Sequence, residues 1–495
     1  MESTVKTRGV AVVFLAMAVA TEGWGKDWKP QIERLVKPAV ESGVVVGMAI
    51  AVVADGQTQT LGFGKTSAAS TQPPDETTLF EIGSVTKVFT ALALADMARE
   101  GLVSLDDPVG KWLPSSVQLP QRDGKEITLA HLATHASGLP RLGRILEAQA
   151  MRNPLNPYAQ FTVDDLHATL ASTRLASVPG AKYAYSNLGV GLLGHVLARR
   201  AGMSYEQLIQ RRICEPLGMC ETRVALPDAW KSRLAEGHDI DGNPLAPWEI
   251  VTLAGCGGLR SSVRDLARFV QANLGLLPSP LGEAIQTTHA PRLDIGSNEA
   301  IGLGWHLKKA EGILWHNGQT GGYHSFVGLR KNPPIGVVVL GNSAGGTVDA
   351  IGYRLLDLLD GKQPPPLPIR VPVRVAPAIL EDYVGNYELY PNFILSVTRT
   401  GDRLWVQATG QPRLGIYPES ETSFFYRAVD ARITFIRNQE GKVDKLVLHQ
   451  HGLALPAFKG GWLVHFGGQM LKGLKQWGRP AANPLPKEPA ASKTD

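Results

Sequence analysis

Short apolar runs separated by turn residues mark both ends of residues 21–362, whereas longer apolar stretches fill the middle. A helix up to about Glu41 is followed by two strand-like runs, 44–53 and 57–63, around the turn Ala54-Asp55-Gly56. Further strand-like runs come at 302–308, 313–316, 324–330 and 335–340. Helical patterns occupy 84–100, 187–200 and 262–274. This order predicts strands at the two ends of the region and helices between them.

A proline-rich segment separates this region from a second one of different texture. Residues 363–378 contain Pro364-Pro365-Pro366-Leu367-Pro368, which is typical of a semi-rigid linker. Beyond it the apolar runs are short, and pairs of them flank Gly401-Asp402 and Glu440-Gly441, as in hairpins. We therefore expect a small antiparallel β domain at 379–470. The last stretch, 471–495, is rich in Pro, Ala and Lys and is expected to be disordered.

The first twenty residues have the composition of an export signal. Lys6 and Arg8 supply positive charge, 9–20 form an apolar run, and Ala18-Val19-Ala20 offers small residues for cleavage. The run is short for a bilayer, although an uncleaved N-terminal anchor is the alternative interpretation. No later segment has the length and purity of a transmembrane helix. We expect residues 1–20 to be a signal peptide and the mature protein, if bacterial, to be periplasmic or secreted.

Charge and cysteine content narrow the possible partners. The formal net charge is only +5 over 495 residues, without a basic stripe of interleaved aromatic residues, which argues against nucleic acid. The three cysteines, Cys214, Cys220 and Cys256, lack the spacing of a metal or redox site. Nothing else in the sequence indicates a metal or a cofactor. Export would permit a Cys214–Cys220 disulfide, but the sequence does not show whether the two side chains meet.

The candidate chemistry begins with Ser84-Val85-Thr86-Lys87, at the start of the predicted helix over 84–100. Residues three apart share a helix face, so the Ser84 hydroxyl and the Lys87 amine are expected side by side. A hydroxyl needs a neighbouring base to become a nucleophile, and a partly desolvated lysine can serve. The alternative is a helix cap beside a surface lysine. The same spacing also occurs by chance at Ser3–Lys6.

Two further motifs favour the chemical interpretation. Tyr185-Ser186-Asn187 precedes a predicted helix, and His316-Asn317-Gly318 ends a strand-like run. Similar patterns occur at Tyr390-Pro391-Asn392 and His465-Phe466-Gly467, without the same order and setting. The three motifs follow one another in the order Ser-x-x-Lys, Tyr-x-Asn, His-x-Gly.

In these motifs the sequence resembles the superfamily of class C β-lactamases and DD-peptidases. Secondary matches support the resemblance over about residues 30–360: Leu132 to Pro140, Pro216 to Met219, Ala254 to Leu259 and Gly302 to Trp305. The terminal β domain, opening with Tyr383 to Tyr387, resembles the small barrel-like modules appended to relatives. The resemblance implies an α/β (α+β) domain of the β-lactamase/transpeptidase-like fold. In it an antiparallel sheet is flanked by helices, and the active site lies between the sheet and a helical lobe.

The resemblance also implies roles. Ser84 would be the nucleophile, and Lys87 and Tyr185 would move the protons, in an order that stays open. The phenol of Tyr185 would lie between cations such as Lys87 and His316.

The remaining site residues would bind the substrate. Asn187 would bond a substrate amide, Gly318 would admit the substrate close to a strand, and the N–H groups of Ser84 and Gln319 would form the oxyanion hole. His316 stands where class C β-lactamases carry a lysine that helps to hold a substrate carboxylate. His135 is expected to pack in a turn, and His324 to be a strand-end side chain rather than a substrate contact.

The expected activity is acyl transfer to water through an acyl-serine intermediate, without metal or cofactor. The substrate would be a small molecule or peptide: a β-lactam, a peptidoglycan stem peptide or an ester. The fold serves β-lactamases, D-Ala carboxypeptidases and carboxylesterases alike, so the substrate stays open. Two other classes remain as alternatives: a penicillin-binding sensor that is acylated without turnover, and a binding module whose specificity lies in 383–458.

Overall fold

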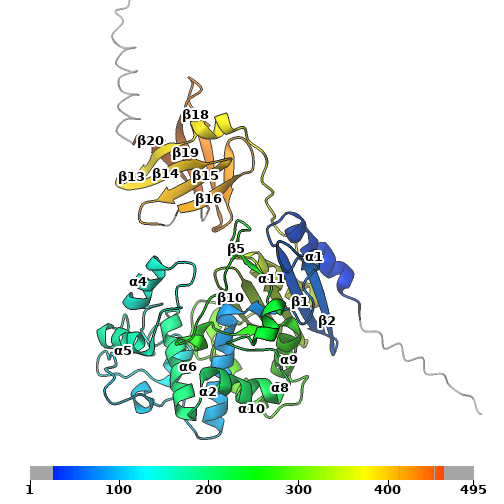
Figure 1. Cartoon of the computed structure of the whole chain (residues 1–495), viewed down its shortest axis with the longest axis vertical. Coiled ribbons are helices and arrows are strands. Elements are labelled where there is room, and N and C mark those ends of the chain that lie inside the picture. Colours follow the sequence, from blue (N-terminus) through cyan, green and yellow to red (C-terminus); the bar gives the residue numbers. More distant parts are fainter. Residues whose placement is uncertain (1–25, 412, 451, 462–495) are drawn as a thin grey trace, which may run out of the picture.

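The computed structural model describes residues 26–411, 413–450 and 452–461 (Figure 1). The predicted signal peptide at 1–20, the tail at 471–495 and the motif at His465 lie outside these residues. No helix within the described ranges is long and apolar enough to cross a bilayer.

An eight-stranded antiparallel sheet forms the centre of the larger domain, in the order β2-β1-β12-β11-β10-β9-β8-β7. Its strands are β1 (Gly47–Ala54), β2 (Gln57–Gly64), β7 (Leu293–Asp294), β8 (Glu299–Ile301), β9 (His306–Lys308), β10 (Ile313–Gln319), β11 (His324–Arg330) and β12 (Ile335–Gly341). The chain thus begins and ends this region with strands that pair with each other, β1 with β12. The strand expected over 302–308 covers only its last three residues, because 302–305 form a turn in which the Gly302 N–H donates to the Trp305 carbonyl (2.8 Å).

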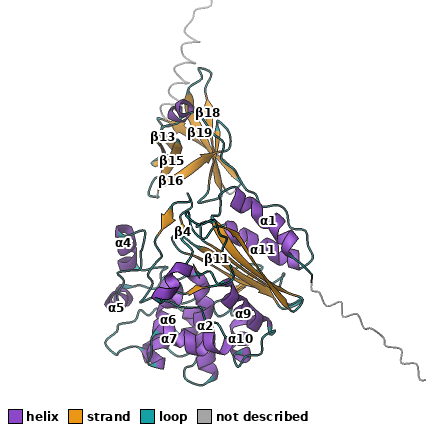
Figure 2. Cartoon of the chain, turned by 45° about the vertical axis from the view of Figure 1, so that its right-hand side comes forward, coloured by secondary structure: helices purple, strands orange, loops and turns teal. Residues whose placement is uncertain are grey.

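Helices cover both faces of this sheet (Figure 2). Along β1, Met48, Ile50 and Val52 face one core with α1 (Lys29–Glu41) and α11 (Thr347–Leu359), and the alternate residues face the other core. Because both faces are covered, every residue of β1 is buried, which explains its continuous apolar run. The domain is therefore built of layers, with helices on either side of the sheet.

The helices of the helical lobe surround the other core, the one that Ala49, Ala51 and Val53 of β1 face. Its centre is α2 (Thr86–Arg99), which is apolar almost all round and buried along most of its length. The other helices are α3 (Leu129–Ala133), α4 (Arg144–Arg152), α5 (Val163–Ser172), α6 (Asn187–Ala201), α7 (Tyr205–Ile209), α8 (Glu215–Leu217), α9 (Val263–Leu274) and α10 (Gly282–His289). Shorter turns and bridges are η1 (Gly83–Val85), η2 (Val109–Trp112), η3 (Gln210–Cys214), η4 (Asp228–Arg233), η5 (Ala254–Cys256), β3 (Phe80–Glu81), β4 (Gly237–His238), β5 (Pro244–Leu245) and β6 (Arg260–Ser261).

The C-terminal domain is a closed eight-stranded antiparallel barrel, which confirms the small β domain expected from the sequence. Its strands are β13 (Gly385–Tyr390), β14 (Phe393–Thr400), β15 (Arg403–Ala408), β16 (Arg413–Pro418), β17 (Ser423–Tyr426), β18 (Ala431–Arg437), β19 (Val443–Gln450) and β20 (Leu453–Lys459). Pairing of β13 with β20 closes it. The short helix α12 (Pro377–Asp382) contributes Leu380 to an interior that aromatic and aliphatic side chains fill.

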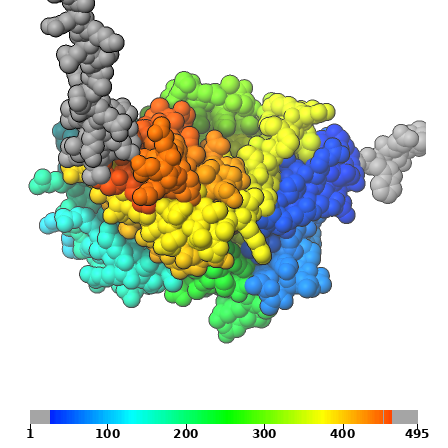
Figure 3. Space-filling model, turned by 90° about the horizontal axis from the view of Figure 1, so that it is seen from above, coloured from blue at the N-terminus to red at the C-terminus, as the bar shows by residue number. Residues whose placement is uncertain are grey.

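The barrel sits over the larger domain, as the view from above shows (Figure 3). It contacts the turn between β4 and β5 through two arginines. Arg403 forms an ion pair with Asp241 (2.8 Å), and Arg427 donates to the Ile240 carbonyl (3.4 Å). The first half of the proline-rich segment lies against the larger domain, where Leu367 and Ile369 pack on the core beside α1.

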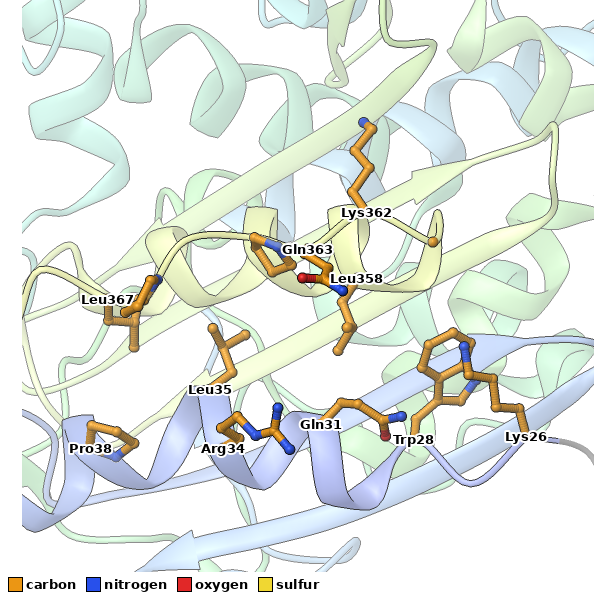
Figure 4. A pocket seen from close by; sticks show the side chains of 13 residues that line it. Lys26, Trp28, Gln31, Arg34, Leu35, Pro38, Leu358, Lys362, Gln363 and Leu367 are labelled. Carbon is orange, nitrogen blue, oxygen red and sulfur yellow. The ribbon is translucent and has the colours of Figure 1, made fainter.

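This segment also borders a cavity of about 440 Å³ between α1 and α11 (Figure 4). Leu35 and Leu358 point into it, and it shares no lining residue with the cavity at Ser84 described below.

All three cysteines are free thiols, so the Cys214–Cys220 disulfide that the sequence left open is absent. Cys214 and Cys256 are buried, and burial raises the pKa of both thiols. Cys220 is exposed on the turn after α8.

Candidate active site

Ser84 lies in a tight turn that leads into α2. The chain passes from β3 through Gly83, whose φ is +48°, into the 3₁₀ turn η1, and α2 begins at Thr86. The α-helix expected from Ser84 therefore starts two residues later, at Thr86, and the serine lies just before its N-terminus. This turn leaves Ser84 partly exposed while Lys87, on the first turn of α2, is wholly buried.

The amine of Lys87 is held by three acceptors. Its Nζ donates to Ser84 Oγ at 2.7 Å, to Asn187 Oδ1 at 2.8 Å and to the Cys256 carbonyl at 2.6 Å. An amide oxygen and a main-chain carbonyl thus fix the amine in place beside the serine hydroxyl. The alternative of a helix cap beside a surface lysine is wrong, because this lysine has no exposed surface.

Asn187 is the first residue of α6, whose N-cap Ser186 accepts a hydrogen bond from the Gly189 N–H. The cap aims the Asn187 side chain at Lys87, and its Nδ2 donates to the Tyr158 hydroxyl at 3.0 Å. The structure therefore gives Asn187 a task besides any contact with substrate, which is to position the lysine.

Tyr185 makes ring contacts with two cations and two histidines, of which His316 lies 6.4 Å away between ring centroids. Lys87 Nζ lies 4.8 Å from the ring centroid, and the Arg141 guanidinium lies 5.2 Å from it. The ring of His135 stacks on it at 4.3 Å. Among the described residues no hydrogen bond joins the Tyr185 hydroxyl to Ser84 or Lys87. The cations at Tyr185 are thus Lys87 and Arg141.

His316 is not a cation at neutral pH, which corrects the expectation that it flanks Tyr185 as one. It is 1% exposed, and burial, the neighbouring His306 and Lys87 hold its pKa well below the ordinary value. Its Nδ1 donates to the Asn317 carbonyl (2.6 Å), and its Nε2 has no hydrogen-bond partner within the described chain. Burial and Lys87 likewise lower the pKa of His306 to about 4. Both imidazoles are therefore neutral at neutral pH.

Two glycines let the end of β10 approach the nucleophile turn backbone to backbone. A Cβ on Gly318 would lie 2.0 Å from the Ile82 carbonyl oxygen and 2.7 Å from the Ser84 nitrogen. A Cβ on Gly83 would lie 2.7 Å from the Gln319 nitrogen. The expected role of Gly318 in admitting substrate stays a prediction; its neighbours show that its lack of a side chain also makes room for the nucleophile turn. The two close approaches place the end of β10, with Gln319, directly against the turn that carries Ser84.

These residues surround a cavity of about 690 Å³. Of the seven site residues predicted from the sequence, five line it (Ser84, Tyr185, Asn187, Gly318 and Gln319), whereas Lys87 and His316 lie buried beneath its surface. Sequence reasoning missed several lining residues: Arg141, Leu142, Leu146, Ala150, Pro154, Pro157, Tyr158, Trp248, His306, Asn317 and Thr320. Arg141 directly follows Pro140, the last residue of a stretch that resembles the superfamily. This position in the sequence was the signal that could have identified Arg141 as a lining residue.

The two other histidines have structural partners. Nδ1 of His135 accepts from the Ser186 N–H at 3.1 Å, so its proton lies on Nε2, and burial keeps its pKa well below the ordinary value. It packs as expected, and it also supports the ring of Tyr185. His324 reaches the rim of the cavity, where its Nε2 pairs with Asp349 at 2.9 Å. Asn317 Nδ2 donates to the other oxygen of that carboxylate at 2.8 Å.

Within residues 26–411, 413–450 and 452–461, no group of three or more His, Cys, Asp or Glu side chains is placed to hold a metal ion. The groups that face the cavity are instead a hydroxyl, a phenol, amides and the main chain of Gly318 and Gln319, with the Lys87 amine buried directly behind the hydroxyl. This combination can activate a hydroxyl and stabilise a developing oxyanion.

Comparison with known proteins bears on both domains. Residues 32–361 match the family model for beta-lactamase, and 370–461 match one described as a domain of unknown function, DUF3471. A beta-lactamase of Pseudomonas fluorescens is 27% identical over 351 residues, covering 64% of this chain and 94% of the relative. The D-alanyl-D-alanine-carboxypeptidase/endopeptidase AmpH of Escherichia coli K12 is 29% identical over 313 residues, covering 59% and 78%.

A solved structure resembles both domains together. The octameric penicillin-binding protein homologue from Pyrococcus abyssi is 27% identical, with a TM-score of 0.62 over 86% of this chain and 99% of the other. The fold expected from the sequence is therefore confirmed. With two thirds of its length matched by the family model, the chain belongs to the beta-lactamase family and is a serine hydrolase of the β-lactamase, D-Ala carboxypeptidase and penicillin-binding protein type.

Proposed function

We propose that this protein is an exported serine hydrolase that forms an acyl-enzyme on Ser84 and cleaves β-lactam or D-Ala-type amide bonds. The observation that carries the proposal is the Lys87 amine. It is wholly buried, anchored by Asn187 and the Cys256 carbonyl, and 2.7 Å from a serine hydroxyl that opens into the cavity.

The reaction proceeds in two halves. Ser84 Oγ attacks the substrate carbonyl carbon, and its proton passes either to the uncharged amine of Lys87 or to the phenolate of Tyr185. The carbonyl oxygen becomes an oxyanion facing the N–H groups of Ser84 and Gln319. Collapse of the intermediate breaks the bond to the leaving nitrogen, which takes up a proton returned by Tyr185. Water then attacks the acyl ester and gives a proton to the same groups. Collapse breaks the bond between the acyl carbon and Ser84 Oγ, which takes that proton as the product acid leaves.

The names of the relatives support amide substrates, since they include beta-lactamases and a D-alanyl-D-alanine-carboxypeptidase/endopeptidase. Ester hydrolysis is the second candidate, favoured by the neutral state of His316. A neutral imidazole cannot form an ion pair with the carboxylate of a β-lactam or peptide, whereas an uncharged ester needs none. Export to the periplasm or medium is inferred from the composition of residues 1–20 alone.

Intact-mass analysis tests the proposal. The protein is exposed to nitrocefin, a penicillin, a D-Ala-D-Ala peptide, a p-nitrophenyl ester and a fluorophosphonate, and turnover is followed in parallel. We expect one covalent adduct on the peptide containing Ser84, absent in Ser84→Ala and unchanged in Ser115→Ala, which alters an exposed serine. A stable adduct without turnover would identify a sensor instead of an enzyme. Labelling at another residue, or undiminished activity of Ser84→Ala, would refute the mechanism.

A further inference from the structure

The charges around the active-site cavity are of one sign. None of the described residues that line it is Asp or Glu. Asp349 lies behind the rim and is engaged by His324 and Asn317, at 2.9 and 2.8 Å. An anionic group entering the cavity therefore meets no free carboxylate, and the question is which cation receives it.

Arg141 is the lining residue with a permanent charge. His306 and His316 are neutral because burial lowers their pKa values, and Lys87 lies beneath the surface with its three donors engaged by Ser84, Asn187 and the Cys256 carbonyl. The Arg141 side chain is exposed, and within the described chain its guanidinium has neither an ion pair nor a hydrogen bond. A guanidinium stays protonated at any pH the enzyme meets and presents paired donors that match a carboxylate.

The backbone of Arg141 is fixed to the catalytic residues. Its carbonyl accepts the N–H groups of Asn187 and Leu188 (2.9 and 3.1 Å), which ties it to the first turn of α6. Its guanidinium lies 5.2 Å from the centroid of the Tyr185 ring. In the proposed mechanism Tyr185 returns a proton to the leaving group, and a cation beside Tyr185 is within reach of the leaving group that this residue protonates.

We propose that Arg141 selects substrates whose leaving group carries a carboxylate, by pairing with that carboxylate while Ser84 attacks. The assignment rests on the proposed function and deepens it. The preferred substrates are acyl compounds that release an amino acid or another fragment with an anionic end, and β-lactams, in which the carboxylate lies on the side of the leaving nitrogen and stays attached to the acyl group after the ring opens. The adjacent apolar wall of Leu142, Leu146 and Ala150 accommodates an apolar part of the same molecule.

Two aryl esters that differ in one group test the assignment. One leaving phenol carries a meta-carboxylate and the other the corresponding carboxamide, and both esters are reactive enough to be cleaved. We expect the full-length enzyme to prefer the carboxylate ester in kcat/KM. Arg141→Gln should lower kcat/KM by about 10- to 100-fold for the carboxylate ester and by less than about threefold for the carboxamide ester. Arg141→Lys should recover part of the loss.

Arg144→Gln is the matched control, because Arg144 is an exposed arginine three residues away that does not line the cavity. The preference should also persist from pH 6 to pH 9, as the guanidinium does not titrate in this range. Equal losses on both esters in Arg141→Gln, no preference in the unaltered enzyme, or a preference that disappears above pH 7 would overturn the assignment. Failure of the proposed function would look different, because no Ser84 adduct would form with either ester.

Discussion

The core of the barrel and the interior beneath Ser84 differ in how completely their buried polar side chains are hydrogen-bonded. In the barrel, the hydroxyl of Tyr383 donates to the Glu421 carbonyl (2.8 Å) and that of Tyr387 to the Tyr383 carbonyl (2.9 Å). Beneath Ser84, an amine and several imidazoles are buried together, and the Nε2 atoms of His135 and His316 have no partner among the described residues. A buried polar atom left without a hydrogen bond costs about 1–3 kcal/mol.

The difference shows what each interior is built for. The core of the barrel is filled by side chains that stabilise it, and its two phenols, of Tyr383 and Tyr387, are satisfied locally. The atoms of the barrel that lack a partner among the described residues, such as the Tyr417 hydroxyl, lie outside this core. The catalytic domain instead keeps unsatisfied groups close to a reactive serine, supported by two apolar cores. Perturbed buried groups of this kind are typical of active sites. We therefore expect activity to depend on the interior of the catalytic domain beneath Ser84 and not on the barrel.

The largest effect is expected from Gly318→Ala. The added methyl would lie 2.0 Å from the Ile82 carbonyl oxygen, a main-chain atom, so β10 must move away from the nucleophile turn. A displacement of the oxyanion donors by about 1 Å can cost 100-fold in rate, and we expect kcat/KM to fall by at least that factor. Gly282→Ala is the control, since a Cβ there meets nothing within 4 Å. Full activity of Gly318→Ala would show that the close approach is not needed.

Asn187→Leu is expected to lower the rate of acylation by about 10- to 50-fold, because Lys87 loses one of its two anchoring acceptors. Tyr158→Phe removes only the hydroxyl behind Asn187 and should cost less than about fivefold. The measurement is the rate of adduct formation at Ser84 under single-turnover conditions. Equal effects of the two variants would mean that Asn187 acts otherwise than by holding the lysine.

Sequence patterns predicted the elements whose pattern is local. The strand at His324–Arg330 begins and ends where the alternation and turn residues place it, and Ser84 with Lys87 followed from their spacing. The strand over 302–308 was too long because Gly304, with φ +74°, packs against α2, where a Cβ would lie 2.9 Å from the Ala91 side chain. That contact joins residues far apart in the sequence.

The same reason limited the candidate site. Trp248 and His306 come to the cavity from separate loops and strands, and no spacing along the chain links them to Ser84. The charge state of His316 depends on burial and on His306, which only the folded chain reveals. Spacing can therefore identify a nucleophile and its base, whereas the wall of the cavity depends on tertiary structure.

Acid is expected to destabilise the catalytic domain through its neutral histidines. His306 has a pKa of about 4 in the folded chain and about 6.5 when unfolded. The unfolded state thus binds the proton first, so the stabilising contribution is complete above pH 6.5 and is lost as pH falls towards 4. We expect His306 to account for about 2 kcal/mol of the decrease in unfolding free energy between pH 7.5 and pH 4.5. Urea unfolding of the unaltered protein and of His306→Gln at both pH values measures it, and parallel decreases would contradict it.

His316→Lys is expected to raise nitrocefin turnover relative to ester turnover by several-fold at neutral pH. A lysine would introduce a charge that the buried imidazole lacks, and the ratio of the two activities cancels effects on the shared catalytic groups. His316→Gln is the neutral control and should leave the ratio unchanged. A ratio that stays flat, or moves towards the ester, in His316→Lys would show that this position does not read the carboxylate.

The smallest effect is expected from removing the barrel. We predict that residues 21–366 fold alone and keep the acylation chemistry within about threefold, because the barrel has its own core. The structure suggests a better end point after Ile369, since Leu367 and Ile369 pack on the catalytic domain. Circular dichroism and Ser84 adduct formation compare both fragments with the full chain. An insoluble fragment of either length would indicate a shared core, and Arg403→Ala in the full chain isolates the contribution of the ion pair to Asp241.

The distribution of the thiols offers a way to watch the two domains move. Cys214 and Cys256 are buried with raised pKa values, so a maleimide dye at neutral pH should react with Cys220 alone. Cys220 does not line the Ser84 cavity, and a dye there leaves the chemistry untouched. With a second dye on a cysteine introduced into the barrel, energy transfer would report the distance between the domains during turnover. The sequence therefore already contains, at Cys220, one of the two labelling sites that such a distance measurement needs.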